Sequence, residues 1–222
     1  MKPTLKIDFV SDVACPWCAV GLGALQQALQ RTQDDFDVTL HFQPFELNPA
    51  MGPEGQDASE HLTEKYGSTP EQQVQIRERI RARGAEVGFT FNPQGRARVW
   101  NTFDAHRLLH WAGLEDAAKQ LALKQALLQA YHGRSENFSE SQVLVACAVS
   151  AGLDGARAQA ILDSDEFALD VREREHLYQR SGIHSVPAVI INDQHLISGG
   201  QPAEVFEQAL REIVAEMPFQ LR

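Results

Sequence analysis

The stretch DVACPWCAVGLGALQQAL, residues 12–29, places two cysteines three positions apart, where an extended run gives way to a helical one. The preceding run, LKIDFV at residues 5–10, alternates apolar and polar side chains, which predicts a strand. Apolar residues then recur at helical spacing over residues 19–31, and alternation resumes in FDVTLHFQPF, residues 36–45. A strand, a helix and a strand in so short a span predict a βαβ unit with parallel strands.

The two cysteines fall at the start of the predicted helix. With Cys15 as N-cap, Pro16 takes the first helical position, where its missing N–H costs nothing. The Cys15 sulfur then faces unsatisfied backbone N–H groups at the positive end of the helix dipole, which favours the thiolate. Cys18, one turn inside, is suited to resolving a mixed disulfide. Asp12 is a complication, because a carboxylate that faces Cys15 opposes thiolate formation.

A structural disulfide and a zinc site are the two other interpretations of this pair. A disulfide between Cys15 and Cys18 closes a very small loop and removes little freedom from the unfolded chain. A zinc site needs four ligands, and the only other cysteine, Cys147, is expected to be a buried, inert thiol. The pair His106 and His110 lies on a predicted amphipathic helix, where surface or packing roles explain it more simply. We therefore favour a redox pair and expect no metal.

Composition narrows the classes of partner. The chain has 222 residues, 43% of them hydrophobic, so a sizeable buried core is expected. Its net charge of −10 repels phosphate backbones, which argues against nucleic-acid binding. No segment resembles a membrane span, and Lys6, Asp8 and Asp12 interrupt the only N-terminal apolar run before a secretory leader could form. We therefore expect no membrane association and a cytoplasmic location.

Helix signals continue almost without a break over residues 58–180. Thr69 and Gln72 flank a proline and predict a capping box at the start of one helix. Ser139 and Gln142 predict a second capping box. This block separates the βαβ unit from the strands expected near the end of the chain.

The last part of the chain returns to strands. The run AVIIN, residues 188–192, is continuously apolar, as in a strand buried on both faces. HLISG, residues 195–199, predicts a short partner strand, and Pro202 opens a final helix. Pro187 stands immediately before the buried strand. It cannot donate a ladder hydrogen bond, so it either starts the strand or occupies a special turn.

With the Cys-Pro-Trp-Cys pair and the later Val-Pro together, the chain resembles the thioredoxin superfamily, and more narrowly the DsbA family, FrnE-like branch. The resemblance covers nearly the whole chain and rests on DFVSDVACPWC, FQPFELNP, NTFDAHRLLHWA, YHGRSENFSESQVL, GIHSVPAVIIN and SGGQP. It implies an α/β, thioredoxin-like fold (βαβ…ββα) with a large inserted all-helical domain. The expected limits are residues 1–48 and 184–222 for the two parts of the thioredoxin-like domain, and residues 49–183 for the insertion.

The resemblance also implies a function. It implies an intracellular protein disulfide oxidoreductase in which Cys15 attacks and Cys18 resolves, with a redox-active Cys15–Cys18 disulfide and no bound cofactor. Its partners would be protein or small-molecule thiols and disulfides, with glutathione as a candidate co-substrate. It further implies that the Val186–Pro187 peptide is cis and lies against the cysteine pair. The residues expected to contact substrate are Pro16, Trp17, Val186 and Pro187.

Two departures from the family pattern matter. Many relatives carry a buried acid beneath the resolving cysteine, but Phe9 stands at that position here, and alternation points Asp8 to the opposite face. The group that transfers the proton is therefore unassigned. The DsbA prototype is exported, whereas this chain shows no leader, which agrees with the FrnE-like branch.

Two other functions remain open on this scaffold. Kappa-class glutathione transferases and hydroxychromene-carboxylate isomerases look similar in fold but use a serine in place of the paired thiols. A peptide-binding chaperone that uses the cysteines only as a redox switch is the second. The run from Arg77 to Arg98 holds six arginines, and it is either a solvated helix face or a basic lip for an acidic substrate such as glutathione.

Overall fold

The computed structural model describes residues 2–217 and contains a four-stranded mixed sheet in the order β2-β1-β5-β6. Strands β1 (Thr4–Ser11) and β2 (Asp37–Pro44) pair in parallel, and α1 (Pro16–Arg31) connects them. Strand β5 (Ala188–Ile191) pairs antiparallel with β1, and β6 (His195–Ser198) pairs antiparallel with β5. The predicted βαβ unit is confirmed, and the first and last parts of the chain build one sheet.

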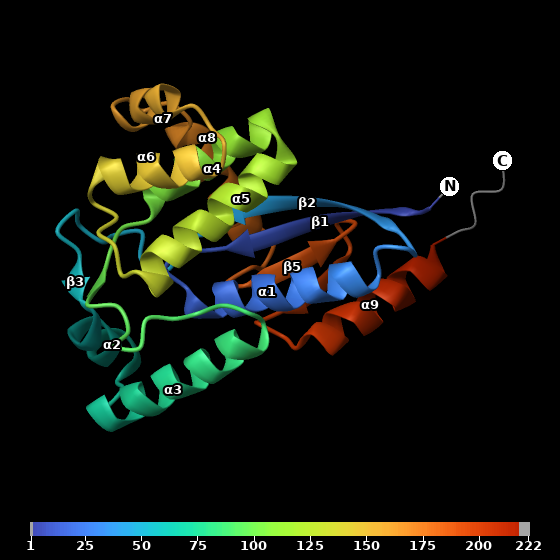
Figure 1. Ribbon diagram of the computed structural model, residues 1–222, viewed down its shortest axis with the longest axis horizontal. Helices are drawn as coiled ribbons and strands as arrows, with labels where there is room; N and C mark the ends of the chain where they lie inside the picture. Colours follow the sequence, from blue (N-terminus) through green and yellow to red (C-terminus); the bar gives the residue numbers. More distant parts are fainter. Residues whose placement is uncertain (1, 218–222) are drawn as a thin grey trace.

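Helix α1 is the central helix on one face of this sheet. It packs against α9 (Ala203–Glu216) and against α3 (Pro70–Glu86), so its two flanks are covered by segments far apart in the sequence (Figure 1). In β1, every second side chain from Leu5 to Phe9 is apolar. These three side chains, Leu5, Ile7 and Phe9, are fully buried and anchor the sheet beneath α1. The cysteine pair therefore begins a helix that is held from three directions.

The segment between β2 and β5 is mostly helical, as predicted. Its remaining helices are α2 (Ala58–Tyr66), α4 (Phe103–Glu115), α5 (Ala117–Leu128), the π-helical turn η1 (Gln129–Gly133), α6 (Ser141–Ser150), α7 (Gly155–Leu162) and α8 (Ala168–Arg180). Helices α4, α5 and α8 pack against β2. Two short strands that alternation did not reveal, β3 (Gln56–Asp57) and β4 (Arg98–Val99), pair antiparallel beside α2.

Of the two capping boxes predicted from the sequence, one is present and the other is not. The capping box of Thr69 and Gln72 is confirmed, with both of its hydrogen bonds present at the start of α3. The box predicted from Ser139 and Gln142 is wrong, because α6 has Glu140 as N-cap. The Ser139 hydroxyl donates instead to Asn137 Oδ1 at 2.7 Å, in a turn that the asparagine organises.

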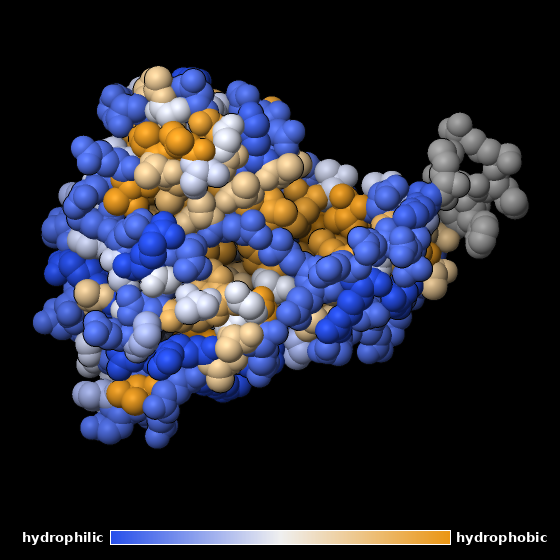
Figure 2. Space-filling model, viewed as in Figure 1, coloured by the Kyte–Doolittle hydropathy of each residue, from blue (hydrophilic) through white to orange (hydrophobic). Residues whose placement is uncertain are grey.

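One apolar cluster joins the sheet, α1 and the helices of the central segment, and it includes Cys15 and Cys18. On the face drawn in Figure 2, apolar side chains gather in a hollow band between α5 and α1, and polar side chains cover most of the outer surface of α9. Within residues 2–217, no helix has the length and apolar character needed to cross a bilayer.

His132, in η1, ties the central segment to the loop before α1. Its Nε2–H donates to the Val13 carbonyl at 2.8 Å, and the ring is buried. Burial, reinforced by the charge of Arg96, lowers the pKa of His132 to about 3. As pH falls from the unfolded value of about 6.5 towards 3, only the unfolded chain takes up a proton here, so folding stability is lost.

We predict that His132→Gln weakens the acid sensitivity of the fold. Between pH 7 and pH 5 the wild type should lose about 2 kcal/mol more than this variant, since each pH unit in this window is worth about 1.4 kcal/mol. Urea unfolding at the two pH values measures the loss. His176→Gln, at an exposed histidine, is the control and should behave as wild type. An equal loss in His132→Gln would contradict the prediction.

Candidate active site

Cys15 is the N-cap of α1, with extended backbone, and Pro16 follows at the first helical position, as predicted. The Cys15 N–H donates to the Asp12 carbonyl at 3.3 Å, and the Cys18 N–H donates to the Cys15 carbonyl at 3.0 Å. Both thiols are free. Cys15 is 5% exposed and Cys18 is fully buried, so the two sulfurs differ in access as well as in position.

The surroundings of the two thiols shift their acidities in opposite directions. A hydrogen bond from the Cys18 thiol outweighs burial and lowers the pKa of Cys15 below its usual value. The Cys15 sulfur makes no regular capping hydrogen bond, but the nearby N–H groups of Cys18 and Trp17 lower its pKa further. Burial, together with the adjacent Cys15, raises the pKa of Cys18 well above its usual value. Cys15 is therefore the better nucleophile.

The turn around Pro187 forms the opposite wall of the cysteine pair. The Val186–Pro187 peptide bond is cis, and the Val186 carbonyl accepts a hydrogen bond from the Cys15 thiol at 3.6 Å. The Pro187 carbonyl in turn accepts from the Gly199 N–H at 2.8 Å. Gly21 of α1 faces the Pro187 ring, and a Cβ at this position would lie 3.0 Å from Pro187 Cγ. A glycine is needed here because α1 and the proline approach so closely.

A cavity of about 560 Å³ opens beside Cys15. Of the residues expected to contact substrate, Pro16 and Trp17 border this cavity, whereas Val186 and Pro187 do not. Its apolar lining comes largely from the central segment and includes Leu47, Leu62, Tyr66, Ile76, Ile80 and Phe91. The central segment thus supplies most of the surface that a molecule would meet on its way to Cys15.

Arginines of the run from Arg77 to Arg98 lie at this cavity. Arg77, Arg81 and Arg96 are among its lining residues, and Arg96 also donates to the Ala14 carbonyl at 2.6 Å. The guanidinium carbon of Arg79 lies 5.9 Å from the ring centroid of Trp17. Positive charge is therefore concentrated around a largely apolar cavity, whose one acidic lining residue within residues 2–217 is Asp57.

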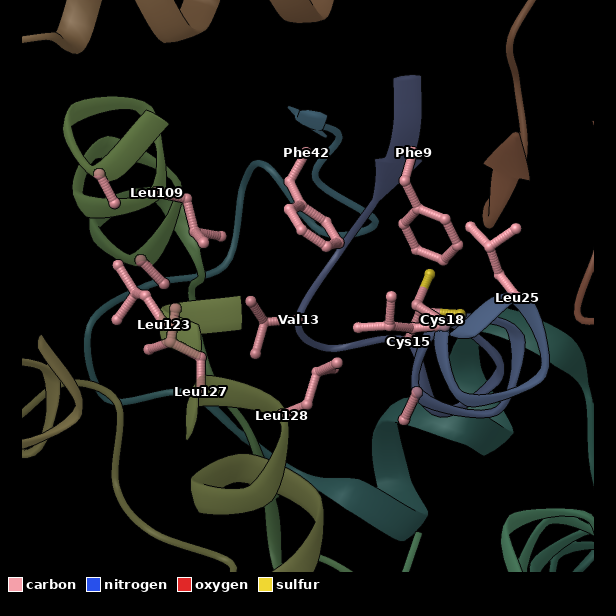
Figure 3. Close-up of a cluster of buried hydrophobic side chains, with 14 of the residues drawn as sticks. Phe9, Val13, Cys15, Cys18, Leu25, Phe42, Leu109, Leu123, Leu127 and Leu128 are labelled. Atoms are coloured by element: carbon pink, nitrogen blue, oxygen red, sulfur yellow. The ribbon is translucent and has the colours of Figure 1, made fainter. Parts of the chain in front are cut away.

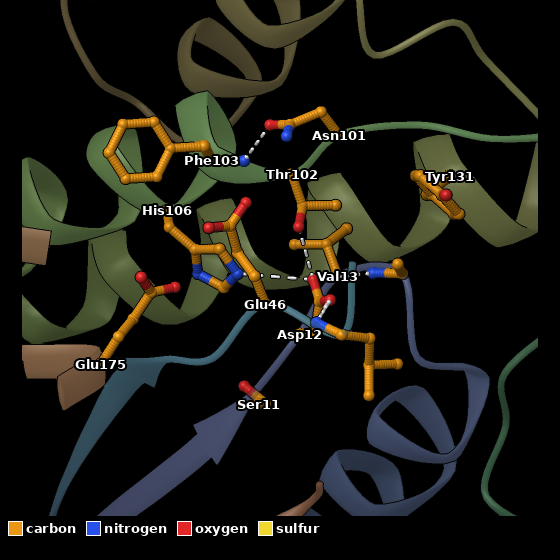
Figure 4. Close-up of polar contacts among 12 residues, drawn as sticks. Ser11, Asp12, Val13, Glu46, Asn101, Thr102, Phe103, His106, Tyr131 and Glu175 are labelled. Carbon is orange, nitrogen blue, oxygen red and sulfur yellow. Dashed lines mark hydrogen bonds and ion pairs between the residues drawn. The ribbon is translucent and has the colours of Figure 1, made fainter. Parts of the chain in front are cut away.

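Asp12 is fully buried and fastens the loop before Cys15 to two other segments (Figure 4). One carboxylate oxygen accepts from the Ala14 N–H at 3.1 Å and from the Thr102 hydroxyl at 2.8 Å, and His106 Nε2 lies 3.4 Å from it. The other oxygen accepts from the Leu47 N–H at 2.7 Å. Burial opposes ionisation, but the contacts from His106 and the other donors outweigh it and lower the pKa of Asp12.

Phe9 occupies the position beneath Cys18, as the sequence predicted, and points towards the two sulfurs (Figure 3). Asp8 lies on the other face of the sheet, where it pairs with Lys6 at 3.0 Å and accepts from Gln43 at 2.6 Å. Sequence reasoning missed Lys124, a fully buried residue of α5 whose charge acts on Cys18. The only signal for it was a lysine within a largely apolar helix.

Cys147 and His110 lie away from this chemistry, whereas His132 is among the residues that line the cavity beside Cys15. Cys147 is buried in α6, as predicted, and burial raises its pKa to about 11. His106 contacts Asp12, while His110 packs on Phe167 at 5.3 Å between ring centroids. No group of three or more histidine, cysteine, aspartate or glutamate side chains within residues 2–217 is arranged to hold a metal ion.

Comparison with known proteins agrees with this geometry. A family model described as "DSBA-like thioredoxin domain" matches residues 6–211. The crystal structure of a probable DsbA oxidoreductase, SCO1869 from Streptomyces coelicolor, is 32% identical, with a TM-score of 0.89 over 98% of this chain and 94% of that one.

More distant structures share the fold. The cytosolic disulfide reductase DsbM from Pseudomonas aeruginosa, solved with GSH, is 16% identical, with a TM-score of 0.63 over 95% of this chain and 99% of that one. A 2-hydroxychromene-2-carboxylate isomerase is 14% identical, with a TM-score of 0.66 over 94% of this chain and 95% of that one. At these identities the likeness is one of architecture.

We predict that Asp12→Asn makes Cys15 more acidic and the fold less stable. Removing the negative charge lowers the pKa of Cys15, because Asp12 raises it. One of the two oxygens becomes an NH2 donor, which leaves either the Leu47 or the Ala14 N–H without its acceptor, and one unsatisfied buried donor costs about 1–3 kcal/mol. Thiolate absorbance against pH and urea unfolding measure the two effects.

Asp8→Asn is the matched control for this substitution, because it removes an equally buried carboxylate on the other face of the sheet. It should leave the titration of Cys15 unchanged. An unchanged Cys15 titration in Asp12→Asn would show that the carboxylate does not act on the thiol.

Proposed function

The chain belongs to the family of DSBA-like thioredoxin domains, and from this premise we propose that it is a thiol–disulfide oxidoreductase that works through Cys15 and Cys18. The observation that carries the proposal is the inequality of the two thiols. Cys15 has a lowered pKa and borders a cavity, and Cys18 lies buried behind it with a raised pKa. A reactive thiol backed by a shielded one is the arrangement that disulfide exchange needs.

The proposed reaction has two steps. The Cys15 thiolate attacks one sulfur of a substrate disulfide, and the other substrate sulfur leaves with its electron pair as a thiolate. Cys18 then attacks Cys15, which releases the second substrate thiol and leaves a Cys15–Cys18 disulfide. The protein is oxidised by two electrons and the substrate disulfide is reduced; the reverse sequence oxidises a dithiol. No bound cofactor takes part, because the cysteine pair itself carries the electrons.

We place the substrate between the cavity and the Val186–Pro187 turn. Trp17 and Pro16 offer apolar contacts on the cavity side. The backbone at Val186 already touches Cys15, so an extended chain that pairs with it would present its sulfur to the nucleophile. Thiols and disulfides of proteins or small molecules are the partners in this proposal, as in the FrnE-like branch, inside the cell.

Glutathione is the small-molecule partner that we propose. It is acidic, and the exposed Arg77, Arg79 and Arg81 surround the approach to Cys15. Within residues 2–217 none of these three makes an ion pair, so their charges are available to an incoming anion. The related fold of DsbM was solved with GSH, which supports this choice of partner.

The glutathione-dependent isomerase or transferase is the second candidate, and the shared architecture of the hydroxychromene-carboxylate isomerase keeps it open. The paired, unequally acidic thiols favour redox chemistry over it. Glutathione conjugation that survives in a Cys15→Ser, Cys18→Ser double variant would favour the second candidate. Peptide binding without turnover in the same variant would favour a chaperone.

The proposal predicts that the protein reduces insulin disulfides in the presence of a thiol reductant and that Cys15→Ser abolishes this activity. The turbidity of the released insulin B chain measures it. Cys18→Ser should instead trap a mixed disulfide on Cys15, detectable by mass spectrometry. Cys147→Ser is the control and should keep full activity, since that thiol is buried away from the site. Equal activity in wild type and Cys15→Ser would falsify the proposal.

The arginines around the cavity beside Cys15 predict that an anionic disulfide reacts faster than a neutral one. Replacing Arg77, Arg79 and Arg81 with Gln should slow the reaction of Cys15 with glutathione disulfide about tenfold at low salt, because the arginines raise the local concentration of the anion. Reaction with the neutral 2-hydroxyethyl disulfide should be unchanged, and added salt should narrow the difference.

Stopped-flow measurement of the first exchange step tests this effect. Arg83→Gln is the matched control, because Arg83 lies on the same helix but pairs with Glu86 at 2.5 Å. Equal slowing with both disulfides would rule out electrostatic recognition of glutathione.

A further inference from the structure

Lys124 is buried without a partner. The residue is 0% exposed, and its Nζ has no hydrogen-bond partner among the residues that the structure describes. Lysine is almost never fully buried unless its charge is paired, because an isolated ammonium is costly to remove from water. Burial accordingly lowers the pKa of Lys124 and favours the neutral amine, which is a base with a free lone pair.

Lys124 lies on a face of α5 whose leucines belong to the same apolar cluster as the cysteine pair. Leu127 and Leu128 follow it by three and four residues and so share its helix face. In Figure 3 Leu128 lies next to Val13, in the loop between β1 and Cys15. The charged or titratable groups that act on Lys124 are Cys18 first, then Asp12 and Cys15, and its own charge acts on His132.

The resolving step needs a proton acceptor at this place. Cys18 is fully buried and its pKa is raised, yet only its thiolate attacks a disulfide. The oxygens of Asp12 already accept hydrogen bonds from several donors, and His132 is a weak base because burial lowers its pKa to about 3. Cys15 is itself bonded to the substrate in this step. The amine of Lys124 is the remaining base near Cys18.

We propose that Lys124 accepts the proton of the Cys18 thiol during resolution, an inference that rests on the proposed disulfide exchange. The S–H proton of Cys18 moves to the Lys124 amine as the Cys18 sulfur attacks Cys15. The bond between Cys15 and the substrate sulfur breaks, and that sulfur leaves with the electron pair. The ammonium then releases its proton to solvent and the departing thiolate takes up a proton from solvent, so charge and protons balance. In the reverse direction Lys124 protonates Cys18 as it leaves.

The proton that Lys124 accepts can be exchanged through a different cavity from the one beside Cys15. Lys124 borders a second cavity of about 530 Å³, together with Phe42, His106 and Gln120. None of the residues that line this cavity lines the cavity beside Cys15. Proton exchange through Lys124 is therefore separated from the opening through which the disulfide substrate reaches Cys15.

Lys124→Met tests the proposal, because methionine keeps the length of the side chain but cannot accept a proton. Reduced protein is mixed with excess glutathione disulfide, quenched with acid at short times and weighed by mass spectrometry. At pH 7 the variant should form the Cys15–glutathione mixed disulfide at the wild-type rate but resolve it about 100-fold more slowly, in line with the loss of a general base. Lys124→Gln should show the same accumulation.

Two further readouts separate this role from a purely structural one. The defect should disappear at high pH, where hydroxide ionises Cys18 without help. The urea midpoint of Lys124→Met should be equal to or above that of wild type, because an unpaired buried amine has been removed. Lys119→Met, at a half-buried lysine on the same helix, is the matched control and should resolve normally.

Resolution at the wild-type rate with the wild-type pH profile in Lys124→Met and Lys124→Gln would overturn the proposal. A rate defect that persists unchanged at high pH would also overturn it, since the loss would then not be one of proton transfer. Failure of the proposed function looks different: Cys18→Ser would then form no mixed disulfide on Cys15 at all.

Discussion

The buried carboxylate of Asp12 is the contact on which the site depends. Asp12 directly follows β1, and its carboxylate contacts the loop after β2 at Leu47 and the start of α4 at Thr102 and His106. These partners belong to parts of the chain that local folding cannot bring together. Because Asp12 comes three residues before Cys15, the same contacts that join the central segment to the sheet also set where α1 begins. The same contacts therefore hold the fold together and set the position of Cys15.

The two sulfurs show how strongly position decides chemistry. They are one helical turn apart and of the same residue type, yet one pKa is lowered and the other raised. Amides at the first turn and a neighbouring thiol favour charge on Cys15, while Phe9 and the apolar cluster disfavour it on Cys18. The negative charge of Asp12 works against Cys15, so the structural contact and the reactive thiol are in partial conflict.

Local rules predicted what local interactions determine. The βαβ unit, the N-cap position of Cys15 and the capping box at Thr69 follow from the pattern of nearby residues, and all are present, although the Cys15 sulfur makes no capping hydrogen bond. The box at Ser139 failed because a nearby asparagine competed for the same hydroxyl. Asp12 and Lys124 were beyond such rules, since their surroundings come from segments 35 to 112 positions away. A lysine on a helix is normally taken as solvated, and only tertiary packing reveals that this one is not.

The turn at Val186 and Pro187, which faces Cys15, is synthesised late in translation. Val186 is 171 positions from Cys15, which at about 5–20 residues per second is roughly 10 to 35 s of translation. During that interval the cysteine pair has emerged from the ribosome, while β5, β6 and the cis-proline turn do not yet exist. The nascent chain therefore carries two uncovered thiols that lack their final acidities, and the unequal pair arises only when the last strands add to the sheet.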